Sequence, residues 1–514
     1  MARILGATLH GIDGVAVEVE VQLSSQLPRV DIVGLPEAAV RESSARVRAA
    51  IASVGQRFPA HRITVNLAPA NIRKRGAGLD LPIAIGILGA AGAFEAAQLE
   101  NLGLVGELAL DGRLRPIQGA LAMTLALRDA GRTRVIVPSG NALEAALTPQ
   151  VEVLHAPDLA EVVRHLVTGS GLSIAVPEPF HDQSGATKLD VAEVRGQARA
   201  KRALEIAAAG GHAVFLRGSP GAGKTMLARR LPGFLPPLEF AEALEVTQIH
   251  GAAGQLSPDN PIVRNRPFRA PHHTTSSAGL LGGGNPPGPG EVSLAHHGVL
   301  FLDELSEFAR KTLEGLREVL EQRRVLIARA RNSCLFPAHF QWIAASNPCP
   351  CGWLGSGVRD CRCDDGATSR YANRISGPLL DRIDLHVSVM PVRWSQLDSP
   401  TTGPTTAELR SRVEAARAIQ QSRGRGEEFV TNADLPDSHL EEAVQATPEA
   451  RLLLGRAVDR LGLSARSARR LLRVARTIAD LAREPTAPAE AMAEALSYRV
   501  PALGGLNAPM DDHV

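Results

Sequence analysis

The residues of this chain with the most definite chemistry form one octapeptide, Gly218 to Thr225, which reads GSPGAGKT. It fits the pattern G-x-x-x-x-G-K-[ST] of a phosphate-binding loop, whose glycines let the backbone wrap a polyphosphate. In this pattern Lys224 reaches the β- and γ-phosphates, and the Thr225 hydroxyl is a ligand for Mg²⁺. The predicted nucleotide-binding residues of the loop are Gly218, Ser219, Pro220, Gly221, Ala222, Gly223, Lys224 and Thr225. We therefore expect the chain to bind a nucleoside triphosphate with Mg²⁺.

Two acidic residues farther along the chain indicate that the bound nucleoside triphosphate is hydrolysed. The apolar run 298–302 ends in Asp303 and Glu304, as a buried strand ends at the edge of a sheet. Asp303 is placed to hold Mg²⁺ together with Thr225. Glu304 is placed to polarise the attacking water. A core strand capped by a surface acid pair is the alternative, and the phosphate loop upstream favours hydrolysis.

Two further polar residues follow apolar runs. Asn347 ends the predicted strand 341–346 and could orient the water or contact the γ-phosphate. Arg382 stands in Leu-Leu-Asp-Arg-Ile-Asp, residues 379–384, just after a turn. A surface salt bridge with Asp381 or Asp384 is an equally good interpretation of Arg382 from the local sequence.

The elements that must position these residues are those of an α/β protein. A strand over 212–216 leads into the phosphate loop, and a helix over 226–231 leaves it with its N-terminal amides toward the phosphates. Residues 1–170 alternate strand-like and helical runs, and polar residues 171–190 are a linker. Residues 191–395 hold every nucleotide motif. After a second break, residues 405–503 are helical by their periodicity.

The composition is that of an ordinary soluble protein. Of 514 residues, 44% are hydrophobic and 21% charged, and the net charge is +2. An aromatic content of 3% argues against base stacking as the main way of holding single strands. With neither a signal peptide nor a run of eighteen apolar residues, we expect a cytoplasmic protein that makes no membrane contact.

The cysteines lie close together in the sequence. Cys349, Cys351, Cys361 and Cys363 form two C-x-C pairs separated by nine residues. Four thiolates at this spacing can close a tetrahedral Zn²⁺ site, which we expect to be structural. Four unrelated thiols are the alternative. Cys334 stands apart and is expected in a core or a hairpin.

Taken together, the phosphate loop, the LFLDE strand (300–304), the Asn-tipped strand and LLDRID resemble an AAA+ ATPase. More narrowly, the stretches RPFRAPHHTT (266–275), PGEVSLAHHG (289–298) and NPCPCG (347–352) are similar to the magnesium-chelatase-like ComM/YifB family. This resemblance implies an N-terminal Lon-protease-like (ribosomal S5 domain 2-like) α+β domain, a central AAA+ αβα P-loop domain and a C-terminal helical lid.

The resemblance also implies roles for single residues. Lys224, Thr225, Asp303 and Glu304 would form the ATPase core, and Asn347 would be the sensor-1 residue. Arg382 would be the arginine finger offered to a neighbouring subunit, with Arg374 as a nearby rival. Arg466 would be sensor 2 on the lid, and the turn that contains Gln197 would line the adenine pocket.

Two surfaces are candidates for contacting DNA. Arg329 and Arg331 alternate with apolar residues, which predicts one arm of a β-hairpin with both arginines on one face. In the resembling helicases a hairpin at this place enters the pore. A solvated edge strand is the alternative. A C-terminal helix carries Arg466, Arg469, Arg470, Arg473 and Arg476. We expect these arginines to belong to the lid surface rather than to a DNA site.

The N-terminal block resembles the Lon fold at residues 76–82 and 105–119. Where Lon carries its Ser nucleophile and Lys base, this chain has Gly78 and Leu121, so proteolysis is excluded. The block is expected to be a ring-forming or DNA-contacting platform, with a basic patch at residues 73–75. The pairs His272-His273 and His296-His297 are expected to be part of the motif structure rather than a metal site, because adjacent histidines in a strand point to opposite faces.

The leading prediction is an ATP-hydrolysing homo-hexameric DNA motor that promotes branch migration or unwinding of recombination intermediates. Its cofactors would be ATP, Mg²⁺ and structural Zn²⁺. Its partners would be branched DNA and possible recombination proteins. A magnesium-chelatase-type ATPase subunit, which drives metal insertion into a tetrapyrrole, is the alternative.

Overall fold

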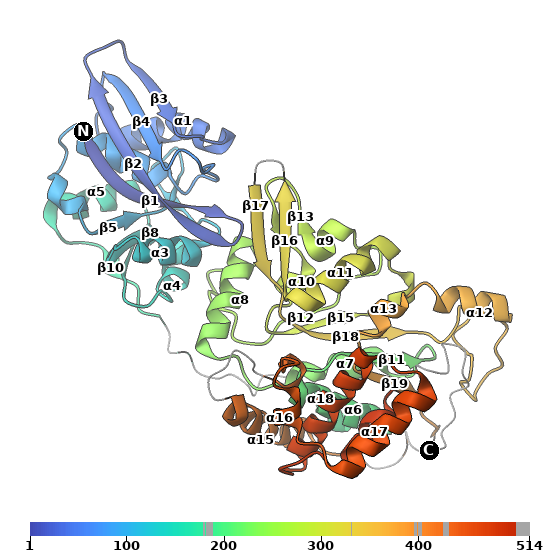
Figure 1. Ribbon diagram of the computed structural model, residues 1–514. Helices are drawn as coiled ribbons and strands as arrows, with labels where there is room; N and C mark the ends of the chain where they lie inside the picture. The colour runs from blue at the N-terminus through green and yellow to red at the C-terminus, as the bar shows by residue number, and fades with distance from the viewer. Residues whose placement is uncertain are drawn as a thin grey trace.

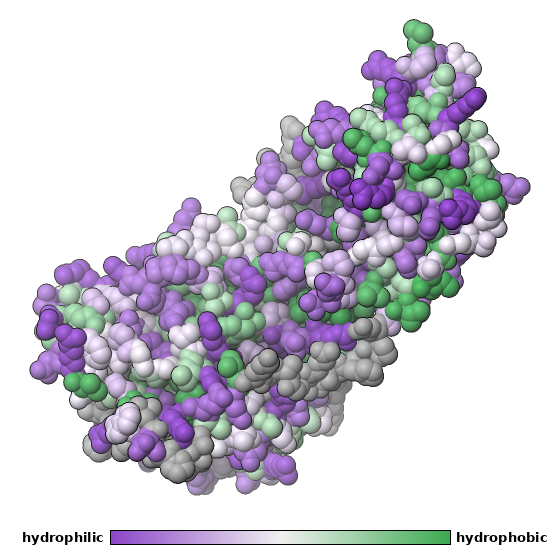
Figure 2. Space-filling view, turned by 180° about the vertical axis from the view of Figure 1, so that it is seen from behind, coloured by the Kyte–Doolittle hydropathy of each residue, from purple (hydrophilic) through white to green (hydrophobic). Residues whose placement is uncertain are grey.

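The computed structural model describes residues 1–177, 180, 189–329, 332–394, 398, 403–424 and 431–499. The chain forms an N-terminal lobe, a central lobe around a parallel sheet, and a bundle of C-terminal helices packed on one side of that sheet (Figure 1). Seen from behind, the outline is elongated, and hydrophilic residues are spread over this face of both ends (Figure 2). Among the described residues, no helix combines the length and the hydropathy needed to cross a bilayer.

The N-terminal lobe is built on a mixed sheet in the order β10-β9-β8-β5-β1-β2-β4-β3. Alternate residues Val17, Val19 and Val21 of β2 are fully buried, because every second side chain of a strand faces the same core. The strands are β1 (Ala2–His10), β2 (Asp13–Ser24), β3 (Arg29–Val33), β4 (Arg62–Ala68), β5 (Leu102–Leu104), β8 (Arg134–Pro138), β9 (Glu152–Ala156) and β10 (Ser173–Ile174), and β6 (Glu107–Leu108) pairs with β7 (Leu114–Arg115). The helices are α1 (Ala38–Ser53), α2 (Asp80–Ala90), α3 (Ala120–Asp129), α4 (Ala142–Ala145) and α5 (Leu159–Thr168). This is the α+β architecture expected for the block.

One prediction for this lobe is wrong. Lys74 does not belong to an exposed basic patch, because it is fully buried. Its ammonium donates hydrogen bonds to the carbonyl oxygens of Pro69 and Ile72, and burial lowers its pKa. The neighbouring Arg75 pairs with Glu37 at 3.3 Å. The three consecutive basic residues therefore do not share one solvated surface.

The central lobe holds a parallel sheet in the order β12-β15-β18-β11-β19. Successive residues Phe215 and Leu216 of β11 pack into different cores, as do Leu300 and Phe301 of β15, so the sheet is covered on both faces. The strands are β11 (Val214–Gly218), β12 (Phe268–Arg269), β15 (Val299–Leu302), β18 (Gln341–Ser346) and β19 (Leu385–Val389), with hairpins β13 (Gly282–Gly283)–β14 (Gly288–Pro289) and β16 (Arg324–Arg329)–β17 (Asn332–Pro337). The helices are α6 (Ala198–Gly210), α7 (Lys224–Ala228), α8 (Phe240–Ala252), α9 (Ser277–Leu281), α10 (Glu291–Leu294), α11 (Arg310–Gln322), α12 (Asp365–Ala372) and α13 (Gly377–Leu380). This αβα arrangement is that of the predicted AAA+ domain.

The C-terminal helices share one core with α6 and one face of the sheet. They are α15 (Thr406–Gly424), α16 (Leu440–Val444), α17 (Pro448–Leu461), α18 (Ala465–Leu481) and α19 (Ala489–Ser497). The arginines of α18 are engaged within the chain. Arg469 and Arg473 both pair with Asp437, and Arg476 is fully buried beside Asp480. As expected, these arginines belong to the lid.

The N-terminal lobe contacts the central lobe through its β1–β2 turn. Gln248 of α8 donates hydrogen bonds to the Ile12 carbonyl at 3.1 Å and to Asp13 Oδ1 at 3.3 Å. Cys334 of β17 is buried, with its sulfur 3.9 Å from Nδ1 of His10. Cys334 is therefore both a hairpin and a core residue, and burial raises the pKa of its thiol.

Candidate ATP-hydrolysis site

The phosphate-binding loop joins the end of β11 to α7. Gly221 and Gly223 have φ of +77° and +97°, a backbone region that residues with a Cβ rarely adopt. The Lys224 ammonium donates to the carbonyl oxygens of Gly218 at 2.7 Å and Ser219 at 3.0 Å. A third hydrogen bond, of 3.1 Å, joins it to Oδ1 of Asn347. The loop carbonyls thus surround the Lys224 ammonium, and the end of β18 brings Asn347 to the same ammonium group.

The predicted magnesium ligands lie together. The Thr225 hydroxyl donates to Oδ2 of Asp303 at 2.7 Å, across the gap between α7 and the end of β15. A hydroxyl and a carboxylate oxygen are donors that suit the hard cation Mg²⁺, which also takes oxygens from the substrate phosphates. Burial lowers the pKa of Lys224, while the charges of Asp303 and Glu304 oppose that shift. The residues present therefore fit ATP with Mg²⁺.

Glu304 has a strained backbone and an unexpected partner. Its φ is +51°, a conformation that costs a residue with a Cβ about 1–3 kcal/mol and that is common at functional sites. Its carboxylate lies 3.0 Å from Nδ1 of His273. His273 arrives there because it follows β12, which lies beside β15 in the sheet. The sequence analysis missed this contact, although His273 lies in the RAPHHTT stretch that precedes the acids.

We expect His273→Ala to raise the basal rate of ATP hydrolysis up to about fivefold. A partly exposed contact of this kind is worth about 0.2–1 kcal/mol, and its loss leaves the Glu304 carboxylate free for water. His272→Ala is the matched control, because His272 is exposed and bonds to Thr274 instead. Steady-state phosphate release measures both variants. A lower rate for His273→Ala than for His272→Ala would mean that His273 holds Glu304 in its working position.

Gln197 links the start of α6 to the loop. Its side-chain amide donates to the carbonyl oxygens of Ala222 at 3.1 Å and Met390 at 2.6 Å. The residue has φ of +56°, at the turn that precedes the helix. Gln197 therefore lies against the phosphate-binding loop, and its contact with adenine stays a prediction.

Arg382 and Arg466 share one carboxylate. Arg382 is buried and pairs with Oε1 of Glu321, near the end of α11, and its second nitrogen donates to the Pro378 carbonyl at 2.6 Å. Arg466, at the start of α18, bonds to the same Oε1 at 2.5 Å. The structure thus brings together the two arginines to which the resemblance assigns nucleotide contacts.

This pair of arginines lies away from the chain's own phosphate-binding loop. Leu385, which begins β19, is aligned with Val214, and Val389 is aligned with Gly218. Arg382 precedes the amino end of β19, whereas the loop follows the carboxyl end of β11. The length of the strand, about 13 Å at 3.3 Å per residue, separates them. Arg382 and Arg466 are therefore not positioned to contact a nucleotide held by the same subunit.

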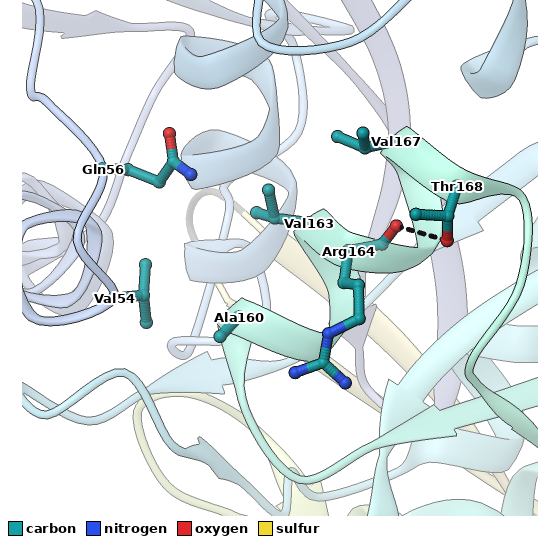
Figure 3. A pocket seen from close by; sticks show the side chains of 7 residues that line it. All are labelled: Val54, Gln56, Ala160, Val163, Arg164, Val167 and Thr168. Atoms are coloured by element: carbon teal, nitrogen blue, oxygen red, sulfur yellow. Dashed lines mark hydrogen bonds between the residues drawn. The ribbon is translucent and has the colours of Figure 1, made fainter.

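Arg374 lies near the carboxyl edge of the central sheet, on the side of Glu304. It pairs with Glu307 at 2.7 Å, three residues after Glu304. Together with Arg310 and Arg370 it lines a cavity of about 470 Å³. A second cavity, of about 300 Å³, lies in the N-terminal lobe, where Val163, Val167 and Arg164 of α5 face the segment after α1 (Figure 3). That cavity includes none of the predicted site residues.

Comparisons with known proteins agree with this architecture. The description "Magnesium chelatase, subunit ChlI" matches residues 190–397, "Subunit ChlI of Mg-chelatase" matches residues 19–141, and the ChlI C-terminal description matches residues 403–499. Competence protein ComM of Haemophilus influenzae is 42% identical over 504 residues, 97% of each chain. The uncharacterised protein YifB of Escherichia coli is 42% identical over 490 residues, 95% of each chain. An uncharacterised protein of Mycobacterium tuberculosis is 42% identical over 500 residues, 97% of this chain.

The chain belongs to the magnesium-chelatase-like ComM/YifB family. Family membership makes it an AAA+ ATPase of this group and implies ATP and Mg²⁺ as its ligands. The geometry of Lys224, Thr225 and Asp303 suits both.

This member of the family also carries a compact cluster of sulfurs. The Sγ atoms of Cys349, Cys351, Cys361 and Cys363 all lie within 4.8 Å of one another. Cys349 Sγ is 3.4 Å from Cys351 Sγ and 3.6 Å from Cys361 Sγ. Tetrahedral Zn²⁺ with Zn–S bonds of about 2.3 Å needs sulfurs about 3.8 Å apart. The arrangement could therefore bind zinc. We call residues 349–363 the cysteine knuckle.

Two cysteines of the knuckle have pKa values shifted in opposite directions. Burial raises the pKa of Cys351, but hydrogen bonds from the Arg362 and Trp353 backbones more than offset this and lower it to about 6. Cys361 has its pKa raised to about 12, since burial and its bonds to Cys351 and Cys349 outweigh a backbone bond from Cys363. Cysteine ligands of Zn²⁺ must be deprotonated, so a bound cation would lower the raised pKa of Cys361.

The pair His296-His297 forms a cluster with Glu245, against the sequence-based argument that adjacent histidines point apart. That argument assumed a strand, but His297 has φ of +53°, and both rings reach Oε2 of Glu245, at 3.0 and 2.9 Å. Nδ1 of His296 accepts the backbone N–H of His339 at 3.0 Å. Its Nε2 therefore carries the proton in the neutral ring and donates it to Glu245. Hydrogen bonds account for the cluster without a metal.

The β-hairpin predicted around Arg329 is present. Strands β16 and β17 are antiparallel, with Leu326 opposite Leu335, and both leucines are exposed, whereas Ile327 and Phe336 on the other face are buried. The hairpin extends away from the central sheet (Figure 1). Arg329 ends β16. The prediction for Arg331 falls outside the described residues, so the expected common face of the two arginines is not tested.

Proposed function

We propose that this chain is the subunit of a homo-hexameric, ATP-driven DNA motor that promotes branch migration or unwinding of recombination intermediates. The observation that carries the proposal is the divided nucleotide site. Lys224, Asp303 and Glu304 lie at the carboxyl edge of the sheet, and Arg382 and Arg466 lie at the amino edge. In a ring, Arg382 and Arg466 of each subunit would contact the nucleotide bound by the next subunit and so complete every ATP-hydrolysis site. This position also favours Arg382 over Arg374 as the trans finger.

Two observations support DNA as the substrate. The β16–β17 hairpin leaves the central lobe with an exposed face, and Arg324, at the start of its first strand, is exposed. Contacts from such arginines to phosphates would be independent of base sequence and sensitive to salt. In addition, a relative that covers the whole chain is named as a competence protein.

A magnesium-chelatase-type subunit is the second candidate, because all three matching family descriptions are named for ChlI. Such a subunit would use the same ATP chemistry to drive metal insertion into a tetrapyrrole. We favour the DNA motor because the β16–β17 hairpin offers an exposed surface and because a relative that matches 97% of the chain is named as a competence protein.

We expect Holliday-junction DNA to stimulate ATP hydrolysis by the wild-type protein and the junction to be unwound when ATP is present. Phosphate release with and without junction DNA, followed by gel analysis of the labelled junction, measures both. Glu304→Gln is the control for contaminating activity and is expected to show neither effect. A wild-type rate that DNA leaves unchanged, together with an intact junction, would exclude the motor and favour the chelatase-type alternative.

We also propose that the knuckle holds a structural Zn²⁺ through its four cysteines. Their spacing in sequence and the mutual distances of their sulfurs support this.

A further inference from the structure

The cysteine knuckle lies directly against the phosphate-binding loop. The contact is between Gly352, inside the knuckle, and Pro220, the third residue of the loop. A Cβ added to Gly352 would lie 2.5 Å from Cδ and 2.8 Å from Cγ of Pro220. Real Cβ atoms do not approach other atoms so closely, so only glycine allows this approach.

Two more contacts join the cysteine knuckle to the nucleotide site. Arg217, buried in β11 just before the loop, donates to the Pro348 carbonyl at 3.2 Å. Pro348 stands between Asn347, which bonds to Lys224, and Cys349, which is fully buried. The knuckle is therefore attached to the nucleotide site through the sensor residue on one side and is packed on the loop on the other.

The position of Gly352 against Pro220 depends on how firmly the knuckle itself is held together. Gly352 follows Cys351 directly, and its N–H donates to the Cys349 carbonyl at 2.9 Å. Few apolar side chains lie within residues 349–363. The sulfur cluster joins the two ends of the segment and, together with the Ser356 hydrogen bonds and the Arg359–Trp353 contact, holds Gly352 in place.

We propose that the metal-loaded cysteine knuckle is a support for the phosphate-binding loop, which fixes the loop in its ATP-binding shape through the Gly352–Pro220 contact. The inference rests on the proposed zinc site and assigns that metal a task at the nucleotide site. It makes ATP affinity depend on zinc, although no cysteine of the knuckle is among the predicted nucleotide contacts.

The test is Gly352→Ala against a matched control in the same segment. Gly357 also has positive φ, +66° against +82° for Gly352, but a Cβ there would meet nothing within 4 Å. Both alanine variants therefore carry similar backbone strain, and only Gly352→Ala crowds Pro220. We expect Gly352→Ala to weaken binding of a non-hydrolysable ATP analogue at least about tenfold, and Gly357→Ala to change it less than about twofold. Equal affinities for the two variants would overturn the proposal.

A double variant separates the contact from general misfolding. Pro220→Ala removes Cγ and Cδ, so Gly352→Ala combined with Pro220→Ala should recover most of the lost affinity relative to Pro220→Ala alone. No recovery would overturn the contact as the cause.

The dependence of ATP-analogue affinity on bound zinc is measured in a separate experiment. Wild-type protein should contain about one Zn²⁺ per chain, and Cys351→Ser or chelation should lower zinc content and analogue affinity together, with zinc unchanged in Gly352→Ala. Wild-type protein without zinc would refute the metal site, whatever the Gly352 result. Zinc loss that leaves affinity unchanged would refute the support role while the zinc site stands. DNA stimulation is not used in any arm, so the motor proposal is judged separately.

Discussion

Replacing Glu304 with Gln is expected to reduce the turnover number for ATP at least about a hundredfold, the usual range for loss of a general base. The amide has nearly the same size but cannot accept a proton from the attacking water. The backbone bond from the Glu304 N–H to Asp303 Oδ1, at 2.9 Å, does not involve the side chain. Binding of ATP with Mg²⁺ should therefore persist within about threefold. Steady-state phosphate release and titration with a fluorescent ATP analogue measure the two quantities.

Glu307→Gln is the control for this prediction. Glu307 lies three residues farther along, at the same edge, and pairs with Arg374. Its replacement changes the charge equally and should leave turnover within about fivefold, because an exposed ion pair is worth at most about 1 kcal/mol. Comparable turnover for the two variants would show that Glu304 is not the base.

Replacing Arg382 with Ala is expected to lower turnover about a thousandfold in the assembled protein, since an arginine finger is worth 10³–10⁵ in rate. The cause would lie between subunits, because Arg382 is at the amino edge of its own sheet. In a mixture of Arg382→Ala and Lys224→Ala subunits, some interfaces combine an intact loop with an intact finger. Phosphate release from the mixture should therefore exceed that of either variant alone.

Mass measurement of the mixed oligomers provides the control for this experiment. If mixed oligomers form but activity does not return, the trans assignment of Arg382 is wrong. Arg374→Ala distinguishes the rival finger, because we expect it to retain far more activity than Arg382→Ala. The reverse order would transfer the role to Arg374.

The motifs that could be predicted from sequence are those in which neighbouring residues do the chemistry. The phosphate-binding loop is eight consecutive residues, and the knuckle cysteines lie within fifteen, so chain connectivity alone keeps their groups close. The strands before the loop and before Asp303 were equally predictable, since buried parallel strands are continuous apolar runs.

Predictions failed where burial or an unusual backbone angle was decisive. Lys74 stands between two arginines in the sequence, yet the fold buries it against carbonyl oxygens. The argument that His296 and His297 diverge failed because a positive φ at His297 turns both rings toward Glu245. Neither effect has a local sequence signal, since each depends on residues that pack from elsewhere.

By itself, the sequence identified the family and predicted the ATPase chemistry and the ligands for the nucleotide and for a metal. Only the tertiary structure decided how those groups are shared. The order of the parallel strands placed His273 beside Glu304. The alignment of β19 with β11 separated Arg382 from Lys224. The fold of the cysteine knuckle brought Gly352 into contact with Pro220. The two contacts join residues 31 and 132 positions apart in the sequence. Their free energy comes from packing across the whole domain, which no local pattern of residue types encodes.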